Sequence, residues 1–206
     1  QNVEEPDKLK LNVVSTHQKV LVEATNLSLS YGDQPLFSDL SFQILPHEIT
    51  ALTGDNGTGK TTLLRKILGE EVFGLTMTGA ITTAANLQIS QLNQQFQLSG
   101  NLRYFANEHQ LRYEELLHTL KQLGFAREKF QTPLAQMSMG EQKRVELAKS
   151  LLTPAQLFIW DEPLNYLDLY NNQQIIEVIK QYQPTMLLVE HDRTFLDQVS
   201  TQEICL

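Results

Sequence analysis

The sequence has almost no cysteine and no long apolar run, and each lack excludes a class of protein. One cysteine, Cys205, among 206 residues cannot form an internal disulfide, which fits a reducing cytosol and predicts a cytoplasmic protein. No run approaches the about 18 apolar residues that span a bilayer, so we expect no direct insertion into a membrane. The polar beginning, QNVEEPDKLK, does not have the apolar core of a signal peptide.

Positive charge is also scarce. The chain has 16 Lys and Arg against 24 Asp and Glu, which gives a net charge of −8. A general nucleic-acid binder carries a basic patch, and this balance argues against one. With 41% hydrophobic and 19% charged residues, the composition is that of a globular protein rather than a disordered one. The length suits one domain, with room for a small subdomain.

The hydrophobic pattern predicts an α/β core that is interrupted by a helical insertion. We expect strands at 20–31, 40–44, 49–53, 80–81 and 87–90, then helical structure from 101 to 152. Beyond it we expect a strand at 157–160, a helix at 169–182 and a strand at 185–189.

A glycine-rich loop follows the strand predicted at 49–53 and precedes a predicted helix. It consists of Gly54, Asp55, Asn56, Gly57, Thr58, Gly59, Lys60 and Thr61. Glycines let the chain turn so that successive N–H groups point at an anion, and the next helix adds its N-terminal dipole. In this pattern Lys60 contacts the β- and γ-phosphates and the Thr61 hydroxyl coordinates Mg²⁺. A chance glycine turn is the alternative, but the flanking strand and helix favour a phosphate site.

Two acids, Asp161 and Glu162, end the apolar strand predicted at 157–160. Such a strand delivers its last side chains to the edge of the sheet where α/β folds bind ligands. An acid pair at a strand end is common on protein surfaces, so the pair alone carries little information. Beside a phosphate loop it indicates a nucleotide hydrolase, in which Asp161 holds the Mg²⁺ shell and Glu162 orients or deprotonates the attacking water.

A third motif, Met137-Ser138-Met139-Gly140-Glu141-Gln142, lies between the first two. With the three motifs in this order, the chain resembles an ABC-type ATPase domain, whose signature is usually Leu-Ser-Gly-Gly-Gln or Leu-Ser-Gly-Gly-Glu. The resemblance implies a P-loop NTPase fold of the α/β class, with a mixed-sheet core, an antiparallel β subdomain and a helical signature subdomain at about 98–140. It implies a domain at 19–206, with residues 1–18 as the remnant of a linker.

The resemblance assigns roles to three more side chains. Tyr31 resembles the aromatic that stacks on adenine, although an edge-of-core tyrosine would look the same. Gln91 resembles the glutamine that reaches Mg²⁺ and the attacking water, and His191 resembles the switch histidine that contacts the γ-phosphate. Gln91 is chosen because it follows the strand predicted at 87–90. Three other glutamines lie nearby: Gln88, Gln94 and Gln95.

The resemblance also implies that such domains work in pairs, each ATP lying between the phosphate loop of one domain and the signature of the other. We therefore expect ATP and Mg²⁺ as ligands and a second ABC domain as partner, on the same full-length chain or in a homodimer. Thr62 would complete the phosphate site. The signature residues Ser138, Gly140 and Glu141 would face the other domain's ATP. Met139 replaces a signature glycine, and a clamp that does not hydrolyse ATP is one alternative.

The segment Asp161-Glu162-Pro163-Leu164-Asn165-Tyr166-Leu167-Asp168 separates two subfamilies. Membrane importers and exporters usually carry Ser or Ala where this chain has Asn165. The soluble F subfamily resembles Asp-Glu-Pro-Thr-Asn-His-Leu-Asp, and Leu164 with Tyr166 looks closest to its antibiotic-resistance members. That resemblance implies the C-terminal ATPase domain of a two-domain protein that acts on the ribosome. The alternative is the ATP-binding subunit of a membrane transporter, with a permease as partner.

Overall fold

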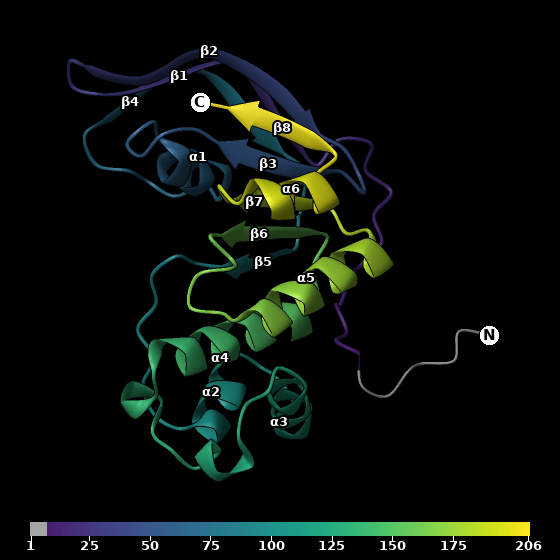
Figure 1. Ribbon diagram of the computed structural model, residues 1–206. Coiled ribbons are helices and arrows are strands. Elements are labelled where there is room, and N and C mark those ends of the chain that lie inside the picture. The colour runs from purple at the N-terminus through teal and green to yellow at the C-terminus, as the bar shows by residue number, and fades with distance from the viewer. Residues whose placement is uncertain (1–7) are drawn as a thin grey trace.

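The computed structural model describes residues 8–206, whose strands form two sheets (Figure 1). The antiparallel sheet has the order β2-β1-β4, with β1 at Val22–Tyr31, β2 at Gln34–Ile44 and β4 at Leu75–Thr83. The second sheet has the order β5-β6-β7-β3-β8, with β3 at Ile49–Thr53, β5 at Ile89–Leu92, β6 at Leu157–Asp161, β7 at Met186–Val189 and β8 at Gln202–Cys205. All of its pairs are parallel, so the core sheet that we predicted to be mixed is parallel within the described residues.

The helices lie both within the segment 101–152, which the sequence predicts to be helical, and outside it. They are α1 at Lys60–Ile67, α2 at Leu102–Glu108, α3 at Tyr113–Gln122, α4 at Met139–Leu152, α5 at Leu169–Tyr182 and α6 at Arg193–Val199. Short 3-10 turns lie at Arg127–Lys129 and Leu134–Gln136. Helices α2, α3 and α4 gather at one end of the molecule, and the antiparallel sheet lies at the other (Figure 1). Between residues 8 and 206, no helix is both long and apolar enough to cross a membrane.

Strand β6 shows why the core strands are apolar along their whole length. Phe158 and Trp160 pack into the cluster that faces the helices, whereas Leu157 and Ile159 pack into the cluster that faces the antiparallel sheet and α1. Strands that are covered on both faces read as continuous apolar runs rather than alternating ones. The polar side chains of this sheet are therefore displaced to the ends of its strands.

A buried hydrogen-bonded group joins α4 to the parallel sheet. The indole N–H of Trp160 in β6 donates to Ser150 Oγ in α4 at 2.8 Å. The hydroxyl of Ser90 in β5 lies 2.7 Å from the same Oγ and donates to the Ser150 carbonyl at 2.9 Å. Because all three side chains are buried, each polar atom needs its partner inside the protein.

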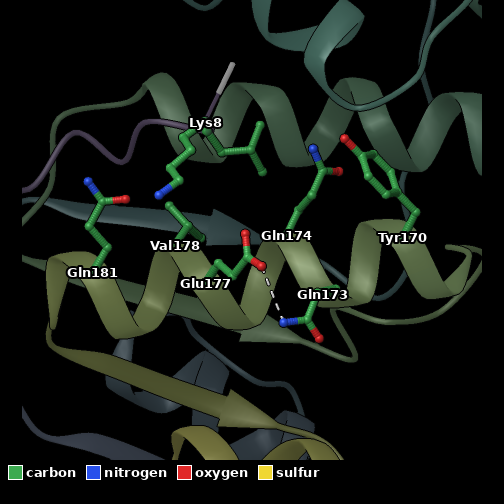
Figure 2. A pocket seen from close by; sticks show the side chains of 8 residues that line it. Lys8, Tyr170, Gln173, Gln174, Glu177, Val178 and Gln181 are labelled. Carbon is green, nitrogen blue, oxygen red and sulfur yellow. Dashed lines mark hydrogen bonds between the residues drawn. The ribbon is translucent and has the colours of Figure 1, made fainter. Parts of the chain in front are cut away.

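The described part of the predicted linker packs against the domain. Leu9 and Leu11 are buried in the helical core cluster, and Val13 forms a parallel bridge with Ala155. Figure 2 shows Lys8 facing side chains of α5 across a cavity of about 100 Å³. The predicted boundary at residue 19 therefore does not separate packed from unpacked chain. Residues 1–7 of that predicted linker lie outside the described residues.

Replacing Ser150 tests the connection between α4 and the sheet. Ser150→Ala leaves the Trp160 indole N–H buried without an acceptor, which costs about 1–3 kcal/mol. The higher helix propensity of alanine offsets a few tenths of that cost. We expect urea denaturation to show a net loss of about 1–2 kcal/mol in the free energy of unfolding. The exposed Ser99→Ala is the matched control, with an expected change within about 0.5 kcal/mol. Equal stability of the two variants would contradict the assignment.

Candidate functional site

The glycine-rich loop lies between β3 and α1, as its flanking sequence predicts. Lys60, the first residue of α1, turns its side chain back over the loop. Its Nζ donates to the carbonyl oxygens of Gly54 at 2.6 Å and Asp55 at 2.9 Å. Thr58 Oγ1 also donates to the Asp55 carbonyl, at 2.8 Å. The loop therefore holds one positive charge above a tight turn at the N-terminus of a helix, which is a geometry that attracts phosphate.

Two glycines are required by the local backbone. Gly59, the N-cap of α1, has a φ of 99°, and a Cβ there would lie 3.0 Å from Leu36 Cβ in β2. Gly54 has a φ of 137°, and a Cβ there would lie 2.6 Å from the carbonyl oxygen of Leu206. The positive φ strains any side chain at both positions, and at Gly54 the close approach of the Leu206 backbone excludes one as well.

A cavity of about 250 Å³, which we call the loop cavity, brings most of the predicted site together. It is lined by Tyr31, Leu36, Asn56, Gly57, Gly59, Lys60, Thr61, Thr62, Gln94, Asp161, Glu162 and Val189. Tyr31 ends β1 beside the loop, and its hydroxyl lies 3.4 Å from Thr62 Oγ1. An aromatic ring at the rim of a phosphate site is suited to stack on a base.

The two acids differ in their surroundings. Asp161 is 7% exposed, and burial, with a further contribution from the Glu162 charge, raises the pKa of its carboxyl to about 6. Glu162 is half-buried and has a φ of 51°, which lies in the left-handed region. Its carboxylate accepts hydrogen bonds from the side-chain amides of Gln94, at 3.0 Å, and of Asn165. These two amides hold the Glu162 carboxylate at the loop cavity, in the position that a general base needs.

The glutamine beside the acid is Gln94 rather than Gln91. Gln91 lies inside β5, opposite Ile159, and lines an adjoining cavity of about 380 Å³. Gln94 lines both cavities and bonds Glu162. A rule that would select Gln94, the first glutamine beyond the strand, depends on the end of β5 at Leu92, which the sequence pattern places at residue 90. Gln94 follows the end of β5 at the carboxyl edge of a parallel sheet, where ligand-binding residues gather.

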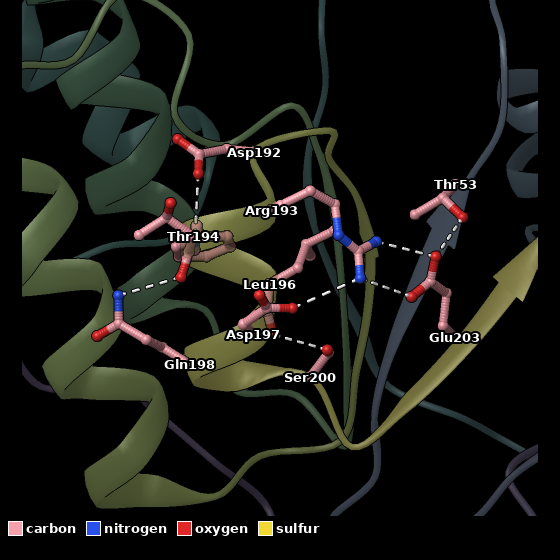
Figure 3. Close-up of polar contacts among 10 residues, drawn as sticks. Thr53, Asp192, Arg193, Thr194, Leu196, Asp197, Gln198, Ser200 and Glu203 are labelled. Carbon is pink, nitrogen blue, oxygen red and sulfur yellow. Dashed lines mark hydrogen bonds and ion pairs between the residues drawn. The ribbon is translucent and has the colours of Figure 1, made fainter.

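The remaining residue of the predicted catalytic group, His191, lies just beyond β7 with its side chain 81% exposed. It is not among the residues that line either cavity. Its backbone N–H donates to the buried carboxylate of Glu190 at 3.0 Å. In Figure 3, Arg193 makes two hydrogen bonds to Glu203 in β8, and Glu203 accepts one from Thr53, just before the loop. This network ties the segment after His191 to the base of the phosphate loop.

The signature residues lie at the N-terminus of α4 and line neither cavity. Ser138 and Glu141 form a capping box, in which each side chain accepts a hydrogen bond from the other's backbone N–H, both at 3.1 Å. A Cβ at Gly140 would lie 3.0 Å from the Tyr166 carbonyl oxygen. The residues of the predicted signature therefore do not line the loop cavity of their own domain.

Lys143 of α4 is a buried cation at the site that the sequence pattern does not indicate. Its side chain is fully buried, and its Nζ donates to the carbonyl oxygen of Glu162 at 3.0 Å. Burial lowers the pKa of Lys143 to about 8, against the opposing effect of the Asp161, Glu162 and Glu190 charges. A single lysine in a helix is usually exposed to solvent, so the sequence around Lys143 gives no indication that it is buried.

The oxygen atoms around the loop cavity fit Mg²⁺. Thr61 and Asp161 line the same two cavities, and they offer a hydroxyl and a carboxylate, the hard oxygen ligands that Mg²⁺ prefers. The buried Asp161 carboxyl, with its raised pKa, is a group that a divalent cation would stabilise in its ionised form. Lys60 stands beside this pair as a point charge for phosphate.

Comparisons with known proteins agree with this geometry. The family model described as "ABC transporter" matches residues 37–165. The ribosome protection protein VmlR of Bacillus subtilis is 32% identical over 204 residues, which cover 96% of this chain and 37% of that protein. The ABC transporter F family member 5 of Arabidopsis thaliana is 28% identical over 201 residues, which cover 96% of this chain and 29% of that protein. The chain thus spans about a third of the length of these relatives.

A solved structure shares the fold. The ATP-binding subunit of an ABC transporter superposes with a TM-score of 0.73 at 22% identity, over 90% of this chain and 85% of that one. The match of the family model covers the loop, the signature and both acids. The chain therefore belongs to the ABC transporter family, as one of its ATP-binding domains.

Proposed function

We propose that this chain is one ATPase half of a two-domain ABC protein of the F type, which hydrolyses ATP and acts on the ribosome in the cytoplasm. The observation that carries the ATPase assignment is the loop cavity, where Lys60 of the phosphate loop and Glu162 with its amide donors lie together. A nucleotide-binding module without hydrolysis would not need a carboxylate held in this way beside the phosphate loop.

The residues divide the work of hydrolysis between binding and water activation. The loop N–H groups, the α1 dipole and Lys60 bind the phosphates, while Tyr31 stacks on the adenine. Glu162 orients the attacking water and accepts its proton, and Gln94 holds the Glu162 carboxylate in place. Mg²⁺, held by Thr61 and Asp161, would neutralise charge on the phosphates. Catalysis of this kind depends on positioning and electrostatics.

A second ABC domain completes the site in this proposal. The signature residues Ser138, Gly140 and Glu141 lie outside the loop cavity of their own chain, so they are free to cover an ATP bound elsewhere. The relatives are much longer than this chain, which covers 37% of VmlR, and that length leaves room for a second domain. We place the chain as the C-terminal half of such a protein.

One relative and one contact within the site support the ribosome as a partner. A relative with 32% identity is named a ribosome protection protein, which supports a role on the ribosome. The proposed role in antibiotic resistance rests on the resemblance carried by Leu164 and Tyr166. Asn165, the residue that resembles the F subfamily, donates to the carboxylate of Glu162 and so has a place in the site. The solved transporter subunit shares the fold alone and does not favour a permease as partner over the ribosome.

Removing the loop lysine tests the phosphate site. Lys60→Ala removes the charge above the loop, and we expect ATP affinity to fall at least about 100-fold, because a charged phosphate contact is lost in a partly buried site. Binding is measured with a fluorescent ATP analogue. Lys66→Ala, at an α1 lysine whose Nζ bonds the Glu70 carbonyl, is the matched control and should bind normally. Unchanged affinity in Lys60→Ala would exclude the loop as the nucleotide site.

Replacing the water-activating acid tests both hydrolysis and the partner. Glu162→Gln should lower turnover at least about 100-fold while ATP still binds, because the neutral amide cannot accept the proton. In the full-length protein it should hold the closed pair, so that the variant cosediments with ribosomes when ATP is present. The exposed Glu177→Gln is the control. Normal turnover in Glu162→Gln would rule out this role, and copurification with a permease instead of ribosomes would favour a transporter.

The two glutamines make opposite predictions. Gln94→Ala removes a donor to the Glu162 carboxylate, and we expect kcat to fall about 10- to 100-fold with little change in KM. Gln91 belongs to β5 and lines the adjoining cavity but not the loop cavity, so Gln91→Ala should change kcat less than about threefold. Steady-state ATP hydrolysis by the paired domains measures both. A larger loss in Gln91→Ala than in Gln94→Ala would restore the assignment made from sequence.

A further inference from the structure

The buried ammonium of Lys143 bonds the peptide of the acid that we assign to water activation. Lys143 lies in α4, the helix that begins at the signature, and its side chain has no exposed surface. Its Nζ donates to the carbonyl oxygen of Glu162 at 3.0 Å. The contact therefore runs from the signature helix of the helical subdomain to the end of β6 in the core sheet.

The peptide groups on either side of Glu162 are held by several hydrogen bonds. Its carbonyl oxygen accepts from Lys143 and, at 3.2 Å, from the Asn165 N–H. Its own N–H donates to the Val189 carbonyl of β7 at 2.8 Å. Glu162 has a left-handed φ of 51°, which a residue with a side chain adopts only where its surroundings enforce it. Lys143 supplies the charged member of this set of bonds.

The charges around Lys143 explain why a cation is retained in the interior. Asp161, Glu162 and Glu190 all act on it electrostatically. Glu190 is buried, and its Oε2 has no hydrogen-bond partner among the described residues. An apolar side chain of similar length would pack in this place without the cost of burying a charge. The ammonium therefore does two things that an apolar side chain could not, since it offsets these negative charges and bonds the Glu162 carbonyl.

We propose that Lys143 is a positioning residue for ATP hydrolysis, which holds the Glu162 peptide so that the Glu162 carboxylate faces the loop cavity. This inference rests on the proposed function, because it assigns a role within the same site. Since Lys143 belongs to the helix that carries the signature, a displacement of α4 relative to the core sheet would also act on the peptide of the acid. The signature of this chain and the acid of this chain are thereby mechanically linked.

Lys143→Met tests the proposal, because methionine keeps an unbranched side chain of similar length without the donor or the charge. The first readout is amide hydrogen exchange of this chain without nucleotide. We expect exchange at the Glu162 and Asn165 N–H groups to become at least about tenfold faster. The second readout is steady-state hydrolysis by the two-domain protein, where we expect kcat to fall about 10- to 100-fold and KM to change less than about twofold.

The matched control is Lys149→Met, in the same helix. Lys149 pairs with Glu146 at 3.0 Å and lies outside both site cavities, so its replacement should leave exchange at Glu162 and kcat unchanged. If circular dichroism shows that Lys143→Met does not fold, Lys143→Leu, which also removes the donor and the charge, is measured in its place with the same expectations. Lys143→Met and Lys149→Met should both bind ATP with wild-type affinity.

The outcomes separate this inference from the proposed function. A wild-type protein that binds no ATP contradicts the proposed function. A wild type that hydrolyses ATP, together with unchanged exchange and unchanged kcat in the Lys143 variant, contradicts the role of Lys143 alone. An equal fall of kcat in Lys143→Met and Lys149→Met also overturns it, because a general loss of helix packing would then explain both. Faster exchange at Glu162 with a selective fall in kcat supports it.

Discussion

The parallel pairing of β7 with its two neighbours is the constraint on which the site depends. Val189 is the register partner of Leu52 in β3 on one side and of Asp161 in β6 on the other. Because parallel strands end at the same edge of a sheet, this register sets the phosphate loop after β3 beside the two acids after β6. The loop lysine and the Glu162 carboxylate, far apart in sequence, line one cavity for that reason. The sheet is covered on both faces, and its strands present apolar side chains to two core clusters.

The same arrangement concentrates charge in a partly buried place. Burial raises the pKa of Asp161 to about 6 and lowers that of Lys143 to about 8, so each group is disfavoured in its charged form by the interior. The surrounding opposite charges offset part of this cost for Lys143, and a bound cation would do so for Asp161. The site thus contains two charged groups, Asp161 and Lys143, that burial alone would favour in their neutral forms. Groups with perturbed pKa values cluster at functional sites, and here two of them lie beside the phosphate loop.

Local sequence predicts the parts of the structure that local chemistry determines. The glycine loop, the strand ending in two acids and the helix at 169–182 follow from turn chemistry and periodicity, and the structure places them as expected. Tertiary contacts determine the rest. Gln94 could not be chosen over Gln91 until the end of β5 was known, and Lys143 reads as a surface lysine until α4 packs on β6. Leu9 and Leu11 lie in a polar stretch without periodicity, and only the helical core gives them a partner.

We propose above all that ATP binds with its phosphates on the glycine loop and that the signature of a second domain completes the binding site. A structure of the full-length protein with a non-hydrolysable ATP analogue and Mg²⁺ tests it most directly. We expect the phosphates against Lys60, Mg²⁺ beside Thr61 and Asp161, and the signature of the other domain across the nucleotide. A nucleotide bound away from the loop would contradict this proposal. So would a nucleotide on the loop that is covered by Ser138 of the same domain.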